Sequence, residues 1–217
     1  MSKGTAIIVG VGPGLGTALA RTFAEAGHPV AILARSQERL DRYASELSGS
    51  GPVRGFGADA ADPGSLRAGI AAAIKELGAP DVLVYNAALL RPDTPTDGDD
   101  SGWVNSLAVN MIGAKVAAET VLPALRGHGS LLFTGGGFAH SPSPEYASLS
   151  VGKAALRAYV HALAGELSGT GVHATVVTVH GAIGGGEERF EPSVLAQAYL
   201  DLHHQDPTDW RPELMRD

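Results

Sequence analysis

The sequence of 217 residues predicts an α/β fold, in which helices cover both faces of a doubly wound parallel sheet of six strands. Short runs of β-branched and aliphatic residues alternate along the chain with longer segments of helical pattern. Strands that are apolar on both faces are typical of a covered parallel sheet, and right-handed crossovers then favour the doubly wound arrangement. The length suits one domain over residues 1–217, and a seventh strand is left open.

The first half of the chain is predicted to contain four strands and three helices. The strands are the apolar runs at 6–9, 30–33, 53–57 and 82–85. A first helix spans 15–26 and ends at Gly27, and a second spans 37–47 with charged residues on its outer face. Asp62 and Pro63 have the residue types of a helix N-cap and a first helical position, so a third helix is expected over 63–77.

The second half is predicted to contain two strands, at 131–134 and 174–179. The segment 91–102 is rich in Pro, Asp, Thr and Gly, which indicates a loop before a long helix at 103–125. A further long helix is expected at 144–167 and a shorter one at 193–203. These elements complete the alternation and leave no internal repeat or interdomain linker.

Composition excludes several classes of function. The net charge of −7 and the lack of a dense basic run argue against nucleic-acid binding, and the absence of cysteine excludes thiolate chemistry. Neither a secretory leader nor an apolar run of about 18 residues is seen, which predicts a cytoplasmic protein without membrane contact. His203 and His204 have no further ligand at metal-binding spacing, so no metal site is expected.

A glycine-rich loop lies between the first strand and the first helix: Gly10-Val11-Gly12-Pro13-Gly14-Leu15-Gly16. Glycines allow the backbone to approach a pyrophosphate, while the free N–H groups and dipole of the helix favour the anion. Since the loop occupies the first crossover of a doubly wound pattern, it predicts nucleotide binding.

The spacing Gly10-x-x-x-Gly14-Leu15-Gly16 resembles the fingerprint of the short-chain dehydrogenase/reductase family. Asp59-Ala60 is similar to the pair with which that family contacts adenine, and Asn86-Ala87-Ala88 resembles its Asn-Ala-Gly motif. The segment 109–113 matches the stretch that carries the family's active-site asparagine, here Asn110. The resemblance extends over nearly the whole chain and implies a Rossmann-like domain that binds a nicotinamide cofactor and acts on a small carbonyl or alcohol.

The end of the second strand favours NADP(H) over NAD(H). NAD-binding domains place an acidic residue there for the ribose 2′-OH, but this chain has Ala34. Arg35 follows and can grip a 2′-phosphate, with help from the hydroxyl of Ser36, and Arg39 is a second candidate cation.

The resemblance also identifies what the catalytic site lacks. The family's Tyr-x-x-x-Lys motif aligns with Leu149 and Lys153, and its serine position falls on Gly136. Asn110 and Lys153 remain, and Lys153 is expected to bind the nicotinamide ribose. The family's Pro-Gly-x-x-x-Thr segment becomes 180–185, which keeps Gly181 and Ile183 as candidate cofactor contacts and has glycine in place of the threonine.

A substitute acid could come from Tyr146, His140 or His180, because each is expected near the cleft and carries a proton that it can transfer. Three functions stay open: an oxidoreductase with a non-standard acid, a redox-inactive NADP(H)-binding sensor or partner protein, and a non-redox cyclase or isomerase. Residues 184–205 are expected to form a short substrate loop. In the family the two long helices commonly pair between subunits, which predicts a homodimer or homotetramer.

Overall fold

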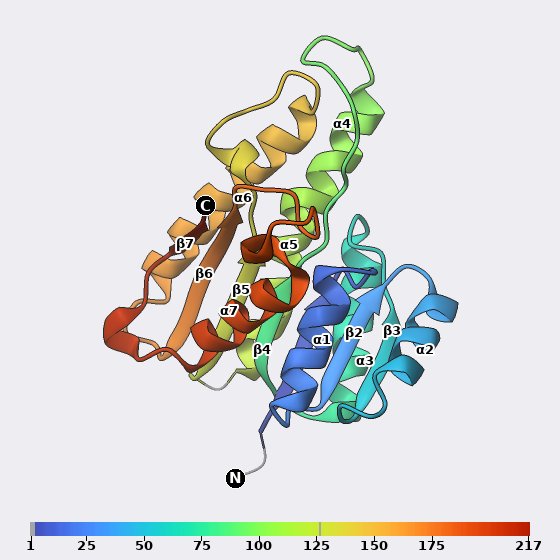
Figure 1. The fold of residues 1–217 in the computed structure, drawn as a ribbon, viewed down its shortest axis with the longest axis vertical. Helices are drawn as coiled ribbons and strands as arrows, with labels where there is room; N and C mark the ends of the chain where they lie inside the picture. The colour runs from blue at the N-terminus through green and yellow to red at the C-terminus, as the bar shows by residue number, and fades with distance from the viewer. Residues whose placement is uncertain (1–2, 126) are drawn as a thin grey trace.

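A seven-stranded parallel sheet forms the centre of the protein in the computed structural model, which describes residues 3–125 and 127–217 (Figure 1). The sheet has the order β3-β2-β1-β4-β5-β6-β7, and every neighbouring pair is parallel. The strands are β1 (Thr5–Val9), β2 (Val30–Ala34), β3 (Val53–Gly57), β4 (Pro80–Tyr85), β5 (Gly129–Thr134), β6 (Val172–Val179) and β7 (Glu213–Arg216). The predicted doubly wound fold is confirmed. The seventh strand, whose existence the sequence did not decide, is present as β7.

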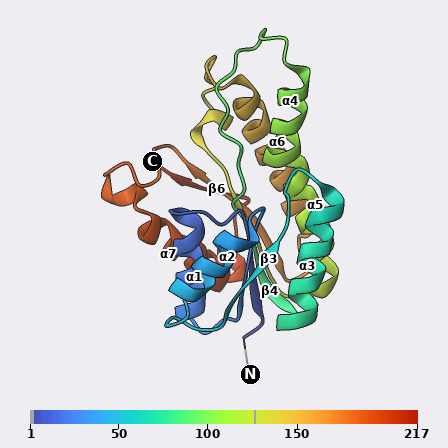
Figure 2. The ribbon, with the colours of Figure 1, turned by 90° about the vertical axis from the view of Figure 1, so that its right-hand side faces the viewer.

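Helices cover the sheet in two layers (Figure 2). One face packs against α1 (Leu15–Glu25), α2 (Gln37–Glu46) and α7 (Pro192–His204). The other packs against α3 (Pro63–Leu77), α5 (Gly113–Val121) and α6 (Ala147–Glu166), and α4 (Asp100–Leu107) continues this layer beyond the sheet. The strands are almost entirely buried between these layers, except at the edges β3 and β7.

Helix starts follow the capping residues. Asp62 accepts hydrogen bonds from the backbone N of Gly64 at 2.8 Å and of Ser65 at 3.3 Å, so α3 has the bounds that its Asp-Pro start predicted. The helix predicted from 103 begins at Asp100, because Asp99 accepts a hydrogen bond from the N of Gly102 and caps it there. The sequence did not single out Asp99 as the cap, because the segment contains several other aspartates that could play this part.

The helix predicted from 144 begins at Ala147. The residues around its start are hydrogen-bonded to the loop that follows β4. The N of Asp93 donates to the carbonyl of Glu145, and the carboxylate of Asp93 accepts from the N of Ser148. Tyr146 forms an isolated bridge with Asp93 and has extended φ with ψ of 51°, which excludes it from the helix. The loop around Asp93 therefore determines where α6 starts.

The helical segment Asp100–Ala124 is long and apolar enough to cross a membrane, by length and composition alone. The apolar residues of this segment do not form one continuous run, because polar residues such as Ser106 and Asn110 interrupt them. Part of the segment packs inside the domain, where α5 contacts α3 and β4. Between α4 and α5, residues Ala108–Ile112 form a π-helical turn.

Candidate functional site

Two cavities open at the carboxyl ends of the strands, where a doubly wound sheet places its ligands. The first, of about 330 Å³, lies over the ends of β1, β2, β3 and β4. The second, of about 800 Å³, lies over the ends of β5 and β6 and the start of α6. The segment that follows β4 contributes to both, with Leu89 in the first and Leu90 in the second.

The glycine loop has the geometry of an anion cradle. Gly10 has a φ of 90°, and a Cβ there would clash with the backbone of Ala87. A Cβ at Gly16 would lie 2.8 Å from the Cα of Val11, so this glycine lets α1 pack directly on the loop. Gly12 and Gly14 instead face open space, and the first turn of α1 has no acidic side chain. The Thr17 hydroxyl accepts from the N of Gly14 at 3.3 Å, and the positive end of the α1 dipole faces the open side of the loop, where it favours a phosphate.

Seven of the predicted cofactor residues line the first cavity: Gly10, Arg35, Asp59, Ala60, Asn86, Ala87 and Ala88. The others do not line it. Pro13 is exposed on the loop, Leu15 and Gly16 are buried under it, and Gly14 borders a separate depression beside Thr17. Ser36 caps α2 by accepting from the N of Arg39 at 3.3 Å, and Gly181 and Ile183 line the second cavity.

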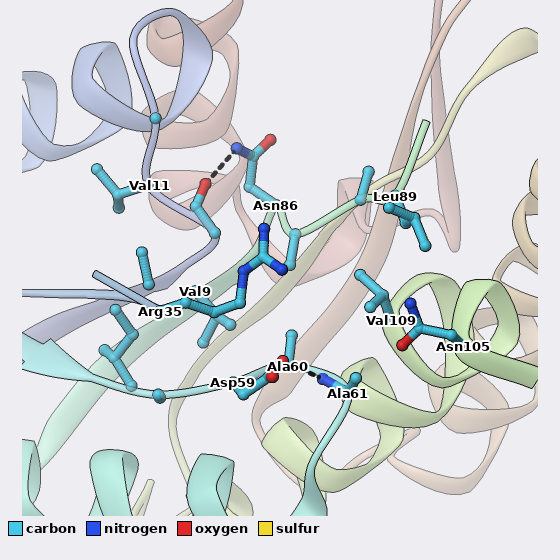
Figure 3. A pocket seen from close by; sticks show the side chains of 17 residues that line it. Val9, Val11, Arg35, Asp59, Ala60, Ala61, Asn86, Leu89, Asn105 and Val109 are labelled. Atoms are coloured by element: carbon cyan, nitrogen blue, oxygen red, sulfur yellow. Dashed lines mark hydrogen bonds between the residues drawn. The ribbon is translucent and has the colours of Figure 1, made fainter. Parts of the chain in front are cut away.

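Arg35 is the only charged side chain other than Asp59 among the described residues that line the first cavity, and it projects among the ends of β1, β3 and β4 (Figure 3). No ion pair of Arg35 occurs in the described part of the chain. The Asp59 carboxylate turns back and accepts from the N of Ala61 at 2.9 Å. Arg35 is thus available to an anionic ligand in this cavity.

A chain of hydrogen bonds joins the glycine loop to the second cavity. Asn86 donates to the carbonyl of Gly10 at 2.9 Å and accepts from the Thr134 hydroxyl at 2.9 Å. Because Thr134 uses its only hydroxyl proton in the bond to Asn86, the Tyr199 hydroxyl, 2.8 Å away, donates to Thr134. The Nζ of Lys153 donates to the Thr134 carbonyl at 2.8 Å. Sequence reasoning missed Thr134 and Tyr199, since neither belongs to a recognisable motif.

Lys153 is buried beside the second cavity, and its desolvation lowers the pKa of the ammonium group to about 8. No carboxylate among the described residues pairs with it. A buried cation held only by a carbonyl is well placed to gain from an anionic or hydroxyl-rich ligand.

Leu149 and Gly136 both line the second cavity together with Lys153. The remaining lining is largely apolar and includes Leu90, Phe138, Val179, Ala182 and Ile183. Gly136 has extended backbone, with φ of −171°, and the nearest atom to a Cβ built there would be the Cγ of Lys153 at 4.0 Å. The site therefore has room for a larger residue at position 136.

Asn110 lines neither cavity. It is fully buried in the π-helical turn, where its Oδ1 accepts from the N of Leu89 at 3.1 Å. Its Nδ2 donates to the Leu89 carbonyl at 3.2 Å and to the Ser106 hydroxyl at 3.1 Å. The amide thus holds the backbone that separates the two cavities.

The three candidate acids are placed differently. Tyr146 lines the second cavity and stacks on Phe138, with ring centroids 5.8 Å apart. His180 also lines this cavity, whereas His140 lies behind it, with its Nδ1 3.2 Å from Nε2 of His180. The structure therefore brings the two histidines together, although 40 positions separate them.

Glu213 of β7 contacts the histidine pair on the His140 side. Its Oε1 is 3.5 Å from Nε2 of His140, and it accepts hydrogen bonds from Arg157 and, at 2.7 Å, from Thr178. Burial alone would raise the pKa of Glu213, but the hydrogen bonds from Arg157 and Thr178 and the charge of Arg157 outweigh it and lower the pKa. A stable carboxylate thus faces His140. Sequence reasoning missed Glu213 because it had left β7 open.

Comparison with known proteins identifies relatives over most of the chain. A family model described as short chain dehydrogenase matches residues 4–183. The 2,3-dihydro-2,3-dihydroxybenzoate dehydrogenase of Bacillus subtilis is 30% identical over 80% of this chain and 67% of its own length. A short chain dehydrogenase of Pseudocercospora fijiensis is 31% identical over 77% of this chain. The chain spans about half the length of some of these relatives, 56% in the latter case.

Solved structures show the same fold. A metagenomic short-chain oxidoreductase in complex with NADP superposes with a TM-score of 0.89, at 22% identity, over 99% of this chain and 97% of that one. An alcohol dehydrogenase from Thermococcus sibiricus complexed with 5-hydroxy-NADP gives a TM-score of 0.87 at 25% identity, over 98% of this chain and 95% of that one.

Proposed function

The chain belongs to the short-chain dehydrogenase family, and from this premise we propose that it is an NADP(H)-dependent oxidoreductase acting on a small carbonyl or alcohol with a histidine-based acid. The observation that carries the proposal is the pair of adjoining cavities, one with a glycine cradle and Arg35, the other with Lys153 and His180. The apolar lining of the second cavity favours a substrate whose carbonyl is flanked by hydrocarbon groups.

The lining of the first cavity supports the proposal of a dinucleotide phosphorylated on its adenosine ribose. The open space at Gly12 and Gly14 suits the pyrophosphate, Asp59 and Ala60 would lie along the adenosine, and Arg35 would pair with the 2′-phosphate. Lys153 would hold the nicotinamide ribose at the edge of the second cavity. When bound, NADPH would supply a hydride to the substrate's carbonyl carbon.

Carbonyl reduction also needs one proton at the carbonyl oxygen, and Leu149 and Gly136 can neither donate nor orient it. We assign the donor role to His180, because it lines the cavity and is backed by His140 and Glu213. His180 would give a proton to the oxygen as the hydride arrives, and His140 would return one to His180. The products are an alcohol and NADP⁺. Tyr146 is the competing donor, since it lines the same cavity.

The assignment is tested by turnover of NADPH with a panel of apolar ketones and aldehydes. His180→Asn should lower kcat by about 10²–10⁴-fold without a matching loss of NADPH affinity, since a positioned general acid contributes that much. Tyr146→Phe is the matched control and should leave kcat nearly unchanged. The reverse pattern would assign the proton to Tyr146 and reject the histidine.

A second function has an observation of its own. Leu149 and Gly136, neither of which carries a group that can transfer a proton, line the cavity beside Lys153, and this lining also suits a protein that binds NADP(H) without redox turnover. If NADPH binds and no compound of the panel is reduced, this sensor function replaces the oxidoreductase. The double variant Leu149→Tyr with Gly136→Ser should then gain reductase activity, since position 136 has room for the added hydroxyl.

A further inference from the structure

A cluster of three histidines lies at the opposite end of the sheet from the two cavities. His28 lies in the connection between α1 and β2, and His203 and His204 end α7. One ring nitrogen from each falls within 4.8 Å of those of the other two. The ring centroids of His28 and His203 are 5.4 Å apart, and those of His203 and His204 are 5.1 Å apart.

The most telling atom of the cluster is Nε2 of His28. The residue is 1% exposed, and this nitrogen is buried without any hydrogen-bond partner in the described chain. The other nitrogen, Nδ1, is 2.8 Å from the carbonyl oxygen of Gly4. A carbonyl can only accept, so the proton of the neutral ring resides on Nδ1, and Nε2 presents an unused lone pair.

His203 is oriented in a similar way. Its Nδ1 lies 3.0 Å from the hydroxyl of Ser130 in β5, which leaves Nε2 as its free nitrogen. Histidines that ligate a metal commonly bond a carbonyl or another polar group through the second nitrogen, which aims the ring.

From this geometry we infer that His28, His203 and His204 form a binding site for a divalent first-row transition ion of the zinc class. Imidazole nitrogens suit zinc, copper, nickel and cobalt, whereas magnesium and calcium prefer oxygen ligands. Three protein ligands leave one tetrahedral position for water. His204 is exposed, so the site is open to solvent.

Asp81 and Lys3 act on the cluster electrostatically with opposite effects, and Asp81 also contacts His128, with 3.3 Å between Oδ1 and Nε2. Phe23 packs against both His28 and His203 and gives the site an apolar wall. A bound ion would link the end of α7 to the turn that follows α1. Helices α1 and α7 already pack against each other.

The test is zinc binding by the full chain, stripped with a chelator and titrated calorimetrically with Zn²⁺. We expect one ion per chain, a rise in Tm on binding, and no competition from Mg²⁺. His204→Ala removes an exposed ligand without disturbing the core and should weaken zinc binding by about 100-fold or more, since even outer contacts to a ligand are worth 10–100-fold. His128→Gln, which removes an exposed imidazole bonded to Asp81, is the matched control and should bind as the unmodified chain does.

Substitution of Co²⁺ supplies a readout that does not depend on affinity alone. A tetrahedral nitrogen site should give the intense visible band of tetrahedral cobalt, and His203→Ala should abolish it. Absence of zinc binding by the unmodified chain would overturn the inference. Equal zinc affinity in His204→Ala and His128→Gln would also overturn it. None of these measurements uses NADPH or turnover, so they stand or fall separately from the proposed redox activity.

Discussion

The proposed preference for NADP(H) rests on one side chain, Arg35. It projects into the first cavity from the end of β2, follows Ala34 where NAD-binding domains have a carboxylate, and has no ion-pair partner within the described residues. A guanidinium placed in this way adds affinity only for the phosphorylated ribose.

The first prediction is that NADPH binds more tightly than NADH and that Arg35→Ala removes most of the difference. Loss of a hydrogen bond to a charged group should cost roughly 1.5–3 kcal/mol. Fluorescence titration with both cofactors measures the effect. Arg39→Ala is the control, because this exposed arginine lies outside the cavity lining. Equal affinities of the unmodified protein for the two cofactors would contradict the prediction.

The second prediction concerns Lys153, whose pKa burial lowers to about 8. Anionic NADPH should favour the ammonium form and raise this pKa in the complex, so cofactor and proton bind together. NADPH affinity should therefore be full below about pH 8 and fall as the pH rises above it, by up to about tenfold per pH unit.

The measurement is the Kd of NADPH between about pH 7 and pH 10, compared with that of Lys153→Met. The variant keeps a side chain of similar length but has no proton to exchange, so its affinity should be weaker and nearly flat over this range. Parallel pH profiles for the two proteins would exclude Lys153 as the titrating group.

At the scale of elements, the site depends on how closely α1 approaches β1 and how β4 is tied to both cavities. Gly16 lies against Val11 and the carbonyl of Gly10, and Asn86 bonds that same carbonyl from the end of β4. Asn110 holds the next segment through Leu89. Displacement of α1 would therefore disturb the cradle and the segment between the cavities together.

The third prediction is that Gly16→Ala destabilises the protein, whereas Gly12→Ala does not. The new Cβ at position 16 would lie 2.8 Å from the Cα of Val11, and overpacking of this kind typically costs about 1–3 kcal/mol. At Gly12 nothing lies within 4 Å, so alanine should be accepted by the fold while intruding on the phosphate. Urea unfolding and NADPH titration of the two variants separate these effects. Equal stability of both variants would contradict the proposed contact.

At the scale of the whole molecule, the layer formed by α4, α5 and α6 has exposed apolar side chains. Val104 is 68% exposed, Val151 46% and Ile112 44%. Large exposed apolar groups on neighbouring helices are typical of a surface that pairs with another copy. Helices α4 and α6 lie beside one another and continue beyond the sheet (Figure 2).

The fourth prediction is that the protein forms a homodimer or homotetramer through this layer. Val104→Asp combined with Val151→Asp should shift it towards the monomer, because two charges would then have to be buried on association. Val194→Asp, on α7 in the opposite layer, is the control. Sedimentation velocity over a concentration series measures the states, and a monomer at every concentration of the unmodified protein would rule the assembly out.

The parts of this protein that the sequence alone determined are those whose signals are local. Apolar runs bounded by turn residues located six strands, Asp62 and Pro63 located the start of α3, and the loop from Gly10 to Gly16 located the first cavity. Each of these depends on neighbours within a few residues, so pattern and propensity suffice.

Only the tertiary structure decided which distant side chains meet. His140 meets His180 and Glu213, Thr134 meets Tyr199, and His28 meets His203, although no local pattern relates the members of any group. The physical reason is the parallel sheet. Each crossover brings the chain back so that all strands start at one side of the sheet and finish at the other, and residues far apart in sequence therefore gather at the strand ends. The edge strand β7 is half-exposed and lacks the apolar run that marks the inner strands, and pairing with β6 is what places it.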